Sequence, residues 1–167
     1  VGSRIAKGIN IINLLEFDNE EKVTSIIKTS DFEIGKYLTM VTKRGIIKRT
    51  ELNAYKNARK KGLIAINLQE EDELVATILT EGKSELLIAT RNGFSIRIDE
   101  NQIRPLARSS QGVRGIKLHD EDYVVGVSCI YDGASVVTIT ENGQGRRTNA
   151  EEYKIQSRGG YGKINYK

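Results

Sequence analysis

The chain has 167 residues, of which 38% are hydrophobic and 29% are charged, with one proline and no tryptophan. This composition excludes collagen, low-complexity disorder and a membrane span, because no apolar run approaches about 18 residues. The net charge of +4 is by itself only weak evidence for a polyanionic partner. The single cysteine, Cys129, cannot form an internal disulfide, and because the chain opens on Val-Gly-Ser without an apolar leader, we expect a segment of a longer polypeptide.

The distribution of charge is more informative than its total. Three short windows, Glu16–Glu21, Gln69–Glu73 and His119–Asp122, hold 11 of the 22 acidic residues and no Lys or Arg. Elsewhere 26 basic residues stand against the other 11 acidic ones. If the acidic windows lie together in space, the remaining surface is basic enough to attract phosphate.

Two independent landmarks repeat along the chain. The glycines that end three strand-and-turn segments, Gly45, Gly93 and Gly143, are 48 and 50 residues apart. The glycines of a second, loop-like motif are spaced by 54, 50 and 50 residues: Gly8, Gly62, Gly112 and Gly162. We therefore expect one domain over residues 1–167, made of a partial unit at the front and about three units of about 50 residues.

Most predicted elements are short strands, because the repeat is rich in Val, Ile, Leu and Thr. In chain order, the predicted strands and strand-and-turn segments are Ile9–Leu15, Val23–Ile27, Tyr37–Gly45, Ile46–Arg49, Leu63–Leu68, Leu74–Leu79, Leu86–Gly93, Phe94–Ile98, Val113–Leu118, Val124–Ile130, Val136–Gly143 and Gln144–Arg147. The Asn-Gly pairs at 92–93 and 142–143 predict tight hairpins with positive φ at both turn residues.

One helical turn is predicted after each return strand. Thr148 with Glu151 has the spacing of a capping box, Asp99 with Gln102 resembles it, and Thr50 with Asn53 is a weaker version. Tyr55 and Tyr153 each follow the cap by five residues and are expected to pack the turn onto the strands.

Four short strands per unit, with no long helix, predict an all-β fold. Radial repetition fits better than a solenoid, which has shorter coils, or a sandwich, which has no such repeat. The expected fold is a propeller-like array of about three to four four-stranded antiparallel blades in an incomplete ring.

Basic residues recur at equivalent positions of the repeat, where they would share one face of the array. Those beside the hairpin turns and on the return strands are Lys43, Arg44, Lys48, Arg49, Arg91, Arg97, Arg146 and Arg147, and those in the glycine loops are Arg59, Lys60, Lys61, Arg108, Arg114, Arg158 and Lys163. We predict that they form a curved basic track for the phosphates of double-stranded DNA, with the acidic windows held elsewhere. Solubility alone would also place Lys and Arg in turns, and charge does not separate DNA from RNA or an acidic protein.

Nothing in the sequence predicts catalysis. His119 is the only histidine, so a histidine-dependent triad or multi-histidine metal site cannot form within the chain, and we interpret the adjacent acidic residues as a solvated turn. No phosphate-binding nucleotide loop is present, and Gly143-Gln-Gly145 lacks the strand-and-helix context of a dinucleotide site. No catalytic, metal or cofactor site is expected in this chain.

The loop at residues 156–162 carries a resemblance to a known family. It resembles the seven-residue box of the C-terminal domain of the bacterial DNA gyrase A subunit, whose usual form is Gln-Arg-Arg-Gly-Gly-Lys-Gly. Five positions match, Gln156, Arg158, Gly159, Gly160 and Gly162, whereas Ser157 and Tyr161 replace basic residues, as in a degenerate copy. Gly62–Leu68 and Arg114–Leu118 also resemble strands of that family.

The resemblance implies a β-pinwheel whose basic outer rim binds and wraps duplex DNA. It further implies a role in ATP-dependent negative supercoiling by a type IIA topoisomerase, in which this segment joins the rest of the gyrase A subunit and the gyrase B subunit in an A2B2 assembly. ATP and Mg²⁺ would bind other domains, and the setting would be the bacterial cytoplasm, near the nucleoid and not in a membrane. Two alternatives stay open: the C-terminal domain of the topoisomerase IV A subunit, and a propeller-like module that binds an acidic protein.

Overall fold

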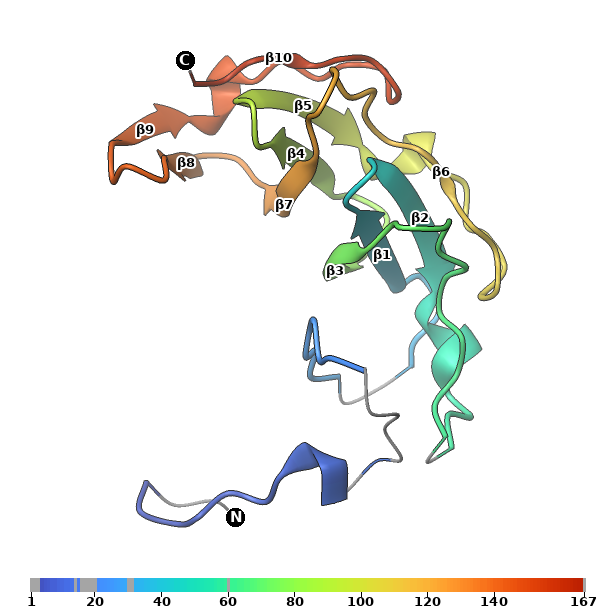
Figure 1. Ribbon diagram of the computed structural model, residues 1–167. Coiled ribbons are helices and arrows are strands. Elements are labelled where there is room, and N and C mark those ends of the chain that lie inside the picture. Colours follow the sequence, from blue (N-terminus) through green and yellow to red (C-terminus); the bar gives the residue numbers. More distant parts are fainter. Residues whose placement is uncertain (1–3, 14, 16–20, 30–31, 60, 167) are drawn as a thin grey trace.

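The protein is described by a computed structural model over residues 4–13, 15, 21–29, 32–59 and 61–166. Over these residues the chain forms two four-stranded antiparallel sheets, one further hairpin and four short 3-10 helices, which together follow a curved arc (Figure 1). The fold is all-β, as predicted, and the sheets succeed one another along the arc as the blades of a propeller do.

The first sheet has the strand order β3-β1-β2-β6 and the second has the order β10-β5-β4-β7. The first contains β1 (Tyr37–Thr42), β2 (Ile46–Glu51), β3 (Leu74–Thr80) and β6 (Val113–Arg114). The second contains β4 (Glu85–Thr90), β5 (Phe94–Asp99), β7 (Val124–Ile130) and β10 (Lys163–Ile164). The third hairpin pairs β8 (Ser135–Ile139) with β9 (Gly145–Asn149). The 3-10 helices are η1 (Ile11–Asn13), η2 (Leu52–Tyr55), η3 (Glu100–Gln102) and η4 (Ala150–Glu152).

Each sheet combines strands from successive repeats, which the sequence did not predict. The hairpin β1–β2 takes β3 on one side and β6 on the other, although β6 follows β2 by more than 60 residues. The hairpin β4–β5 takes β7 and β10 in the same way. Neighbouring repeats are therefore tied together by backbone ladders as well as by side-chain packing.

The predicted hairpins and the strands beside them are confirmed, but three predicted strands are not. Val23–Ile27 and Leu63–Leu68 form no strand, and Val113–Leu118 is a strand only over its first two residues. In place of a strand, Ile9–Leu15 contains η1, and Leu14 lies outside the described residues. These segments are apolar enough for strands, but no described hairpin offers a full ladder to them, and a strand needs a partner to satisfy its backbone groups.

The hairpin turns differ from the predicted type. Gly45, Gly93 and Gly143 have φ near +80°, but neither Asn92 nor Asn142 has a positive φ. In each turn the glycine N–H donates to the carbonyl of a threonine three residues earlier, and that threonine's Oγ1 accepts from the residue after the glycine. The three threonines are Thr42, Thr90 and Thr140. A threonine side chain thus closes every hairpin in place of a second left-handed residue.

Of the three predicted helix caps, only the one at Asp99 is confirmed. Its carboxylate accepts from the Asn101 N–H at 2.7 Å. The caps predicted at Thr50 and Thr148 are wrong, because the caps of η2 and η4 are the following residues, Glu51 and Asn149, and neither makes a side-chain capping bond. These helices last about one turn and are held mainly by the sheets they abut.

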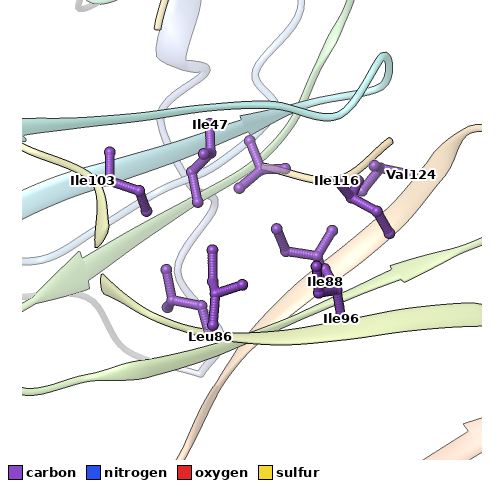
Figure 2. Packing of buried hydrophobic residues seen from close by; sticks show 9 residues of the cluster. Ile47, Leu86, Ile88, Ile96, Ile103, Ile116 and Val124 are labelled. Carbon is purple, nitrogen blue, oxygen red and sulfur yellow. The ribbon is translucent and has the colours of Figure 1, made fainter. Parts of the chain in front are cut away.

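The main core lies between the two four-stranded sheets. Ile47 from β2, Leu86 and Ile88 from β4, and Ile96 from β5 meet there with no exposed surface (Figure 2). A smaller cluster of Leu87, Ile130 and Ala150 joins the second sheet to the β8–β9 hairpin, and Tyr153 packs against it as predicted. Alternate residues of β4 therefore serve two cores, which is why Leu86, Leu87 and Ile88 are all buried.

Candidate nucleic-acid interface

The outer edge of the arc is formed by β6, β10 and the glycine loops that precede them, residues 107–112 and 157–162. β6 and β10 lie on the convex side, whereas β3 and β7 lie on the concave side (Figure 1). A Cβ on Gly112 would lie 2.7 Å from the Ile47 carbonyl oxygen, and one on Gly162 would lie 2.4 Å from that of Ser95. Both glycines also have a positive φ, so only glycine lets these loops lie so close to the sheet.

Several predicted basic residues are exposed on or beside this outer edge. Arg114, Arg158 and Lys163 are exposed, and Arg108 is half-buried. Arg59 and Lys61 are exposed in the first glycine loop, near the other end of the arc, and Lys60 lies outside the described residues. These residues fit the predicted position of a DNA-binding surface, although their binding to DNA stays a prediction.

The box at residues 156–162 joins the two sheets. The Gly159 N–H donates to the Gly115 carbonyl at 2.6 Å, and the Gly160 carbonyl accepts from the Lys117 N–H at 2.8 Å. The Arg158 guanidinium donates to two carbonyls, those of Gln102 at 3.0 Å and Arg114 at 3.1 Å. The one arginine left in this degenerate box therefore has a structural role as well as an exposed surface.

Three predicted track residues on the return strands are turned away from solvent. Lys48 is fully buried, and its Nζ donates to the Ala65 carbonyl at 2.6 Å and to the Arg108 carbonyl. Burial, together with the nearby Arg108 charge, lowers the pKa of Lys48 from 10.5 to about 8. With its donors already used inside the protein, Lys48 is not placed to reach a phosphate on the surface.

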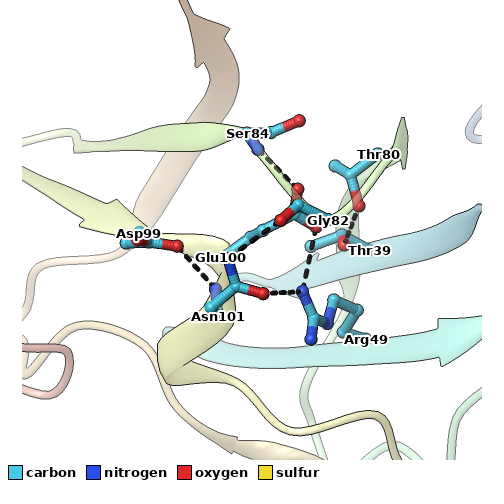
Figure 3. Close-up of polar contacts among 8 residues, drawn as sticks. All are labelled: Thr39, Arg49, Thr80, Gly82, Ser84, Asp99, Glu100 and Asn101. Carbon is cyan, nitrogen blue, oxygen red and sulfur yellow. Dashed lines mark hydrogen bonds and ion pairs between the residues drawn. The ribbon is translucent and has the colours of Figure 1, made fainter. Parts of the chain in front are cut away.

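Arg49 and Arg97 occupy one equivalent position and are held in the same manner. Arg49 Nη1 lies 3.2 Å from Glu100 Oε2 and 3.2 Å from Asn101 Oδ1, and both side chains of the ion pair are almost fully buried (Figure 3). Arg97 donates to Glu85 Oε2 and to the Ala150 and Tyr153 carbonyls. Both arginines fasten a strand to the 3-10 turn of the next repeat, so we remove them from the predicted track.

The acidic windows are not held apart from the basic residues, contrary to the prediction. Arg44 Nη2 lies 3.2 Å from Glu71 Oε2, and Lys43 Nζ lies 3.4 Å from Glu73 Oε2. The backbone N–H groups of Arg44 and Asn92 donate to the carboxylates of Asp72 and Asp122, at 3.0 and 2.9 Å. The windows at 69–73 and 119–122 therefore cap the hairpin tips and neutralise part of their charge. The window at 16–21 lies outside the described residues except for Glu21.

The remaining predicted cations differ in how free they are. Arg91 lies 3.8 Å from the Glu141 carboxylate, in an exposed pair. Arg146 donates to the Asn165 carbonyl and lies over the Tyr166 ring, whereas Arg147 is simply exposed on β9. The same position of the repeat is thus occupied in Arg49, Arg97 and Arg147, but only Arg147 has its side chain open to solvent.

Some exposed cations near the outer edge were missed by sequence reasoning. Arg104 and Lys154 are exposed 50 residues apart, a spacing that could have identified them. Lys117 Nζ lies 4.6 Å from the centre of the Tyr161 ring, on which His119 stacks at 4.6 Å. His119 is therefore part of an aromatic stack with Tyr161 and Phe94 beside the box, which a single sequence does not reveal.

The described residues contain no group of three or more His, Cys, Asp or Glu that could hold a metal ion. Burial raises the pKa of the Cys129 thiol, which keeps it in the less reactive protonated form. In the described part of the chain, no helix is long and apolar enough to span a bilayer.

Comparison with known proteins identifies the family. The family model of the DNA gyrase C-terminal domain, beta-propeller, matches residues 1–30, 36–81, 84–130 and 134–167. The DNA gyrase A subunit of Clostridium acetobutylicum is 47% identical over 98% of this chain, and that of Haloquadratum walsbyi is 41% identical over 99%. The chain spans about a fifth of the length of these relatives, 20% in each case.

Two solved structures share the fold over most of the chain. A crystal structure of the C-terminal domain of DNA topoisomerase IV matches with a TM-score of 0.88 at 33% identity, over 94% of this chain and 49% of that one. A DNA gyrase A C-terminal domain matches with a TM-score of 0.85 at 26% identity, over 95% of this chain and 53% of that one. Together with the repeat, the box and the curved array of sheets, these matches show that the chain belongs to the family of DNA gyrase C-terminal domains with a beta-propeller fold.

Proposed function

We propose that the chain binds duplex DNA along its outer edge, with little sequence preference, and bends the duplex around the convex side of the arc. The observation that carries the proposal is the recurrence of exposed cations in successive glycine loops and on the strands after them. Arg59 and Lys61 belong to the first loop, Arg108 and Arg114 to the second loop and β6, and Lys163 to β10.

Duplex DNA matches such a surface because its phosphates recur at short, regular intervals. Each Lys or Arg set against a phosphate releases condensed counterions, which drives binding at low salt. Bending a site of 20–30 base pairs costs on the order of 1–6 kcal/mol, so contacts must continue along the arc to offset it. The described residues include no helix longer than four residues, so no recognition helix is available to read bases in the major groove.

In the whole protein, we propose that this DNA contact supports ATP-dependent negative supercoiling by DNA gyrase. Partners would be the remainder of the gyrase A subunit and the gyrase B subunit in an A2B2 assembly. ATP and Mg²⁺ would act on other domains, and the complex would work in the cytoplasm at the nucleoid. The curated relatives, which are DNA gyrase A subunits, support this role over that of topoisomerase IV, although the C-terminal domain of topoisomerase IV has the higher TM-score of the two solved structures.

A binding experiment separates DNA recognition from a general affinity for acidic partners. The chain is titrated at low salt with two unrelated duplexes of equal length, and poly-glutamate is then added as a competitor. We expect equal affinities for the two duplexes and little competition by poly-glutamate. Tight binding of poly-glutamate with no binding of either duplex would instead identify a protein-interaction module.

Bending is measured on the same complex by fluorescence transfer between dyes at the two duplex ends. We expect the ends to approach when the chain binds. Binding with no change in the distance between the ends would contradict the proposed bending while leaving DNA binding intact.

A further inference from the structure

The two seams between successive sheets have the same backbone geometry. In the first seam, between the first and second sheets, Ile47 on β2 pairs with Val113 on β6. In the second seam, between the second sheet and the β8–β9 hairpin, Ser95 on β5 pairs with Lys163 on β10. These pairs are 48 and 50 residues apart, so the sequence fills one structural position in two different ways.

The first seam is packed with apolar side chains and the second is not. Ile47, Ile96, Ile98 and Ile103 have no exposed surface in the first seam. The corresponding residues of the second seam, one repeat later, are Ser95, Arg146, Thr148 and Tyr153. They surround a hollow of about 150 Å³ that is also lined by Lys154, Lys163 and Asn165. This volume has room for a phosphate group.

The lining of this hollow carries an excess of positive charge. Arg97 is neutralised by Glu85, and Glu152 is the one carboxylate among the lining residues, whereas Arg146, Lys154 and Lys163 are all cationic and exposed. Among the described residues, neither Lys154 nor Lys163 has a side-chain partner. The polar neighbours are held in place, since Tyr153 Oη donates to Asn165 Oδ1 at 2.6 Å and Asn165 Nδ2 donates to Thr138 Oγ1 at 3.0 Å.

We propose that the second seam is a phosphate-binding pocket, in which Arg146, Lys154 and Lys163 hold the anion. The proposal deepens the proposed function, because a phosphodiester of bound duplex DNA and a free phosphate ion offer the same oxygen atoms to these cations. The fold itself does not require this lining: the first seam shows that the same position packs well with isoleucine. Gathering cations around a hollow costs stability unless an anion or water compensates them.

Binding of free phosphate is tested by thermal unfolding in sodium phosphate and in sodium chloride of equal ionic strength. Wild-type chain is expected to gain about 3–5 °C in Tm once phosphate exceeds its Kd roughly tenfold. The double variant Arg146→Gln with Lys163→Gln should lose this gain. The control, Lys56→Gln with Lys83→Gln, removes the same charge from exposed sites outside the pocket and should keep it.

A second variant guards against an effect on folding alone. Ser95→Ile, Arg146→Ile and Lys163→Val rebuild the packing of the first seam, so we expect a chain that stays folded, shows an equal or higher Tm in chloride and has no response to phosphate. A wild-type Tm that does not respond to phosphate, or a rebuilt seam that responds as strongly as wild type, would overturn the pocket.

Duplex binding by the same variants identifies the source of the phosphate. Weaker duplex binding by Arg146→Gln with Lys163→Gln, but not by the control, supports occupation by the DNA backbone. Loss of the phosphate response with unchanged duplex binding supports a free phosphate ion. If wild-type chain binds no duplex at all, the proposed function fails, but the phosphate response still decides whether the pocket exists.

Discussion

Arg49 on β2 and Glu100 at the start of η3 form a buried ion pair between two sheets, with Arg49 Nη1 3.2 Å from Glu100 Oε2. One repeat later Arg97 donates to the carbonyl of Ala150, the residue 50 positions after Glu100. Glu100 Oε1 also accepts from the Ser84 N–H at 2.6 Å (Figure 3). The repeated arginine is thus a fastener between repeats, and its positive charge is used inside the fold.

Removing Arg49 should destabilise the chain severely. Arg49→Ala leaves Glu100 buried without its cation, and breaking a buried pair in this way costs about 3–5 kcal/mol. Arg91→Ala is the matched control, because its pair with Glu141 is exposed and such pairs contribute about 0–1 kcal/mol. Urea unfolding of both variants measures the difference. Equal losses would mean that the buried pair does not join the sheets.

The buried Lys48 should make stability depend on pH in the alkaline range. Its pKa is about 8 in the folded chain and 10.5 in the unfolded chain, so between these values the unfolded chain holds a proton that the folded chain has lost. The free energy of unfolding should therefore gain a contribution that rises with pH from about 8 to 10.5.

Lys48→Met removes this contribution, and the difference between wild-type and variant unfolding curves isolates it. Tyr55, whose pKa burial raises above 10, is present in both proteins and cancels in the difference. Parallel curves for wild type and variant across this range would contradict a lowered pKa at Lys48.

Gly162 should be far less tolerant of alanine than Gly62. Both have a φ near +75°, and the left-handed conformation costs an L-residue about 1–2 kcal/mol. Only at Gly162 would the added Cβ also meet the Ser95 carbonyl oxygen, at 2.4 Å, whereas at Gly62 it meets nothing within 4 Å. We expect Gly162→Ala to lose about 1–3 kcal/mol more than Gly62→Ala. Similar losses in chemical denaturation would show that the loop can move off the sheet.

The two carboxylates at the first hairpin tip should behave differently. Glu71→Gln removes an exposed pair with Arg44 and should leave stability nearly unchanged, with duplex affinity equal or higher because Arg44 is freed. Asp72→Asn weakens bonds to the N–H groups of Arg44 and Glu73 and should cost about 1–3 kcal/mol. Thermal unfolding and duplex titration test both. A large loss of duplex affinity in Glu71→Gln would place the binding surface at the acidic turns.

The sequence predicted the elements that local chemistry determines. Threonine and glycine fix each hairpin, and runs of Val and Ile fix the strands beside it, so β1, β2, β4, β5, β8 and β9 were found. It did not predict which strands pair, because β6 and β10 are two-residue strands whose partners lie about 65 residues earlier in the chain. That pairing depends on how whole repeats stack.

The candidate site was predicted in part for a related reason. A basic residue on a return strand looks the same in sequence whether it faces solvent or the next sheet, so Lys48, Arg49 and Arg97 were assigned to the surface. The pairing of Glu71 with Arg44 was missed because 27 residues separate them. Alternation along one strand shows two faces, but only the neighbouring sheet decides which face is covered.

The central claim is that cations of the glycine loops and the outer strands, not those of the hairpin tips, hold the DNA backbone. It is tested most directly by the slope of log binding constant against log salt for a duplex, which changes by about 0.9 for each phosphate contact. The variant Arg59→Gln, Arg108→Gln and Arg114→Gln should lower the slope by about 2.7. Its control, Lys43→Gln, Arg44→Gln and Arg91→Gln, removes the same charge from the acid-paired tips and should lower it much less. Equal reductions, or a larger one for the tips, would contradict the claim.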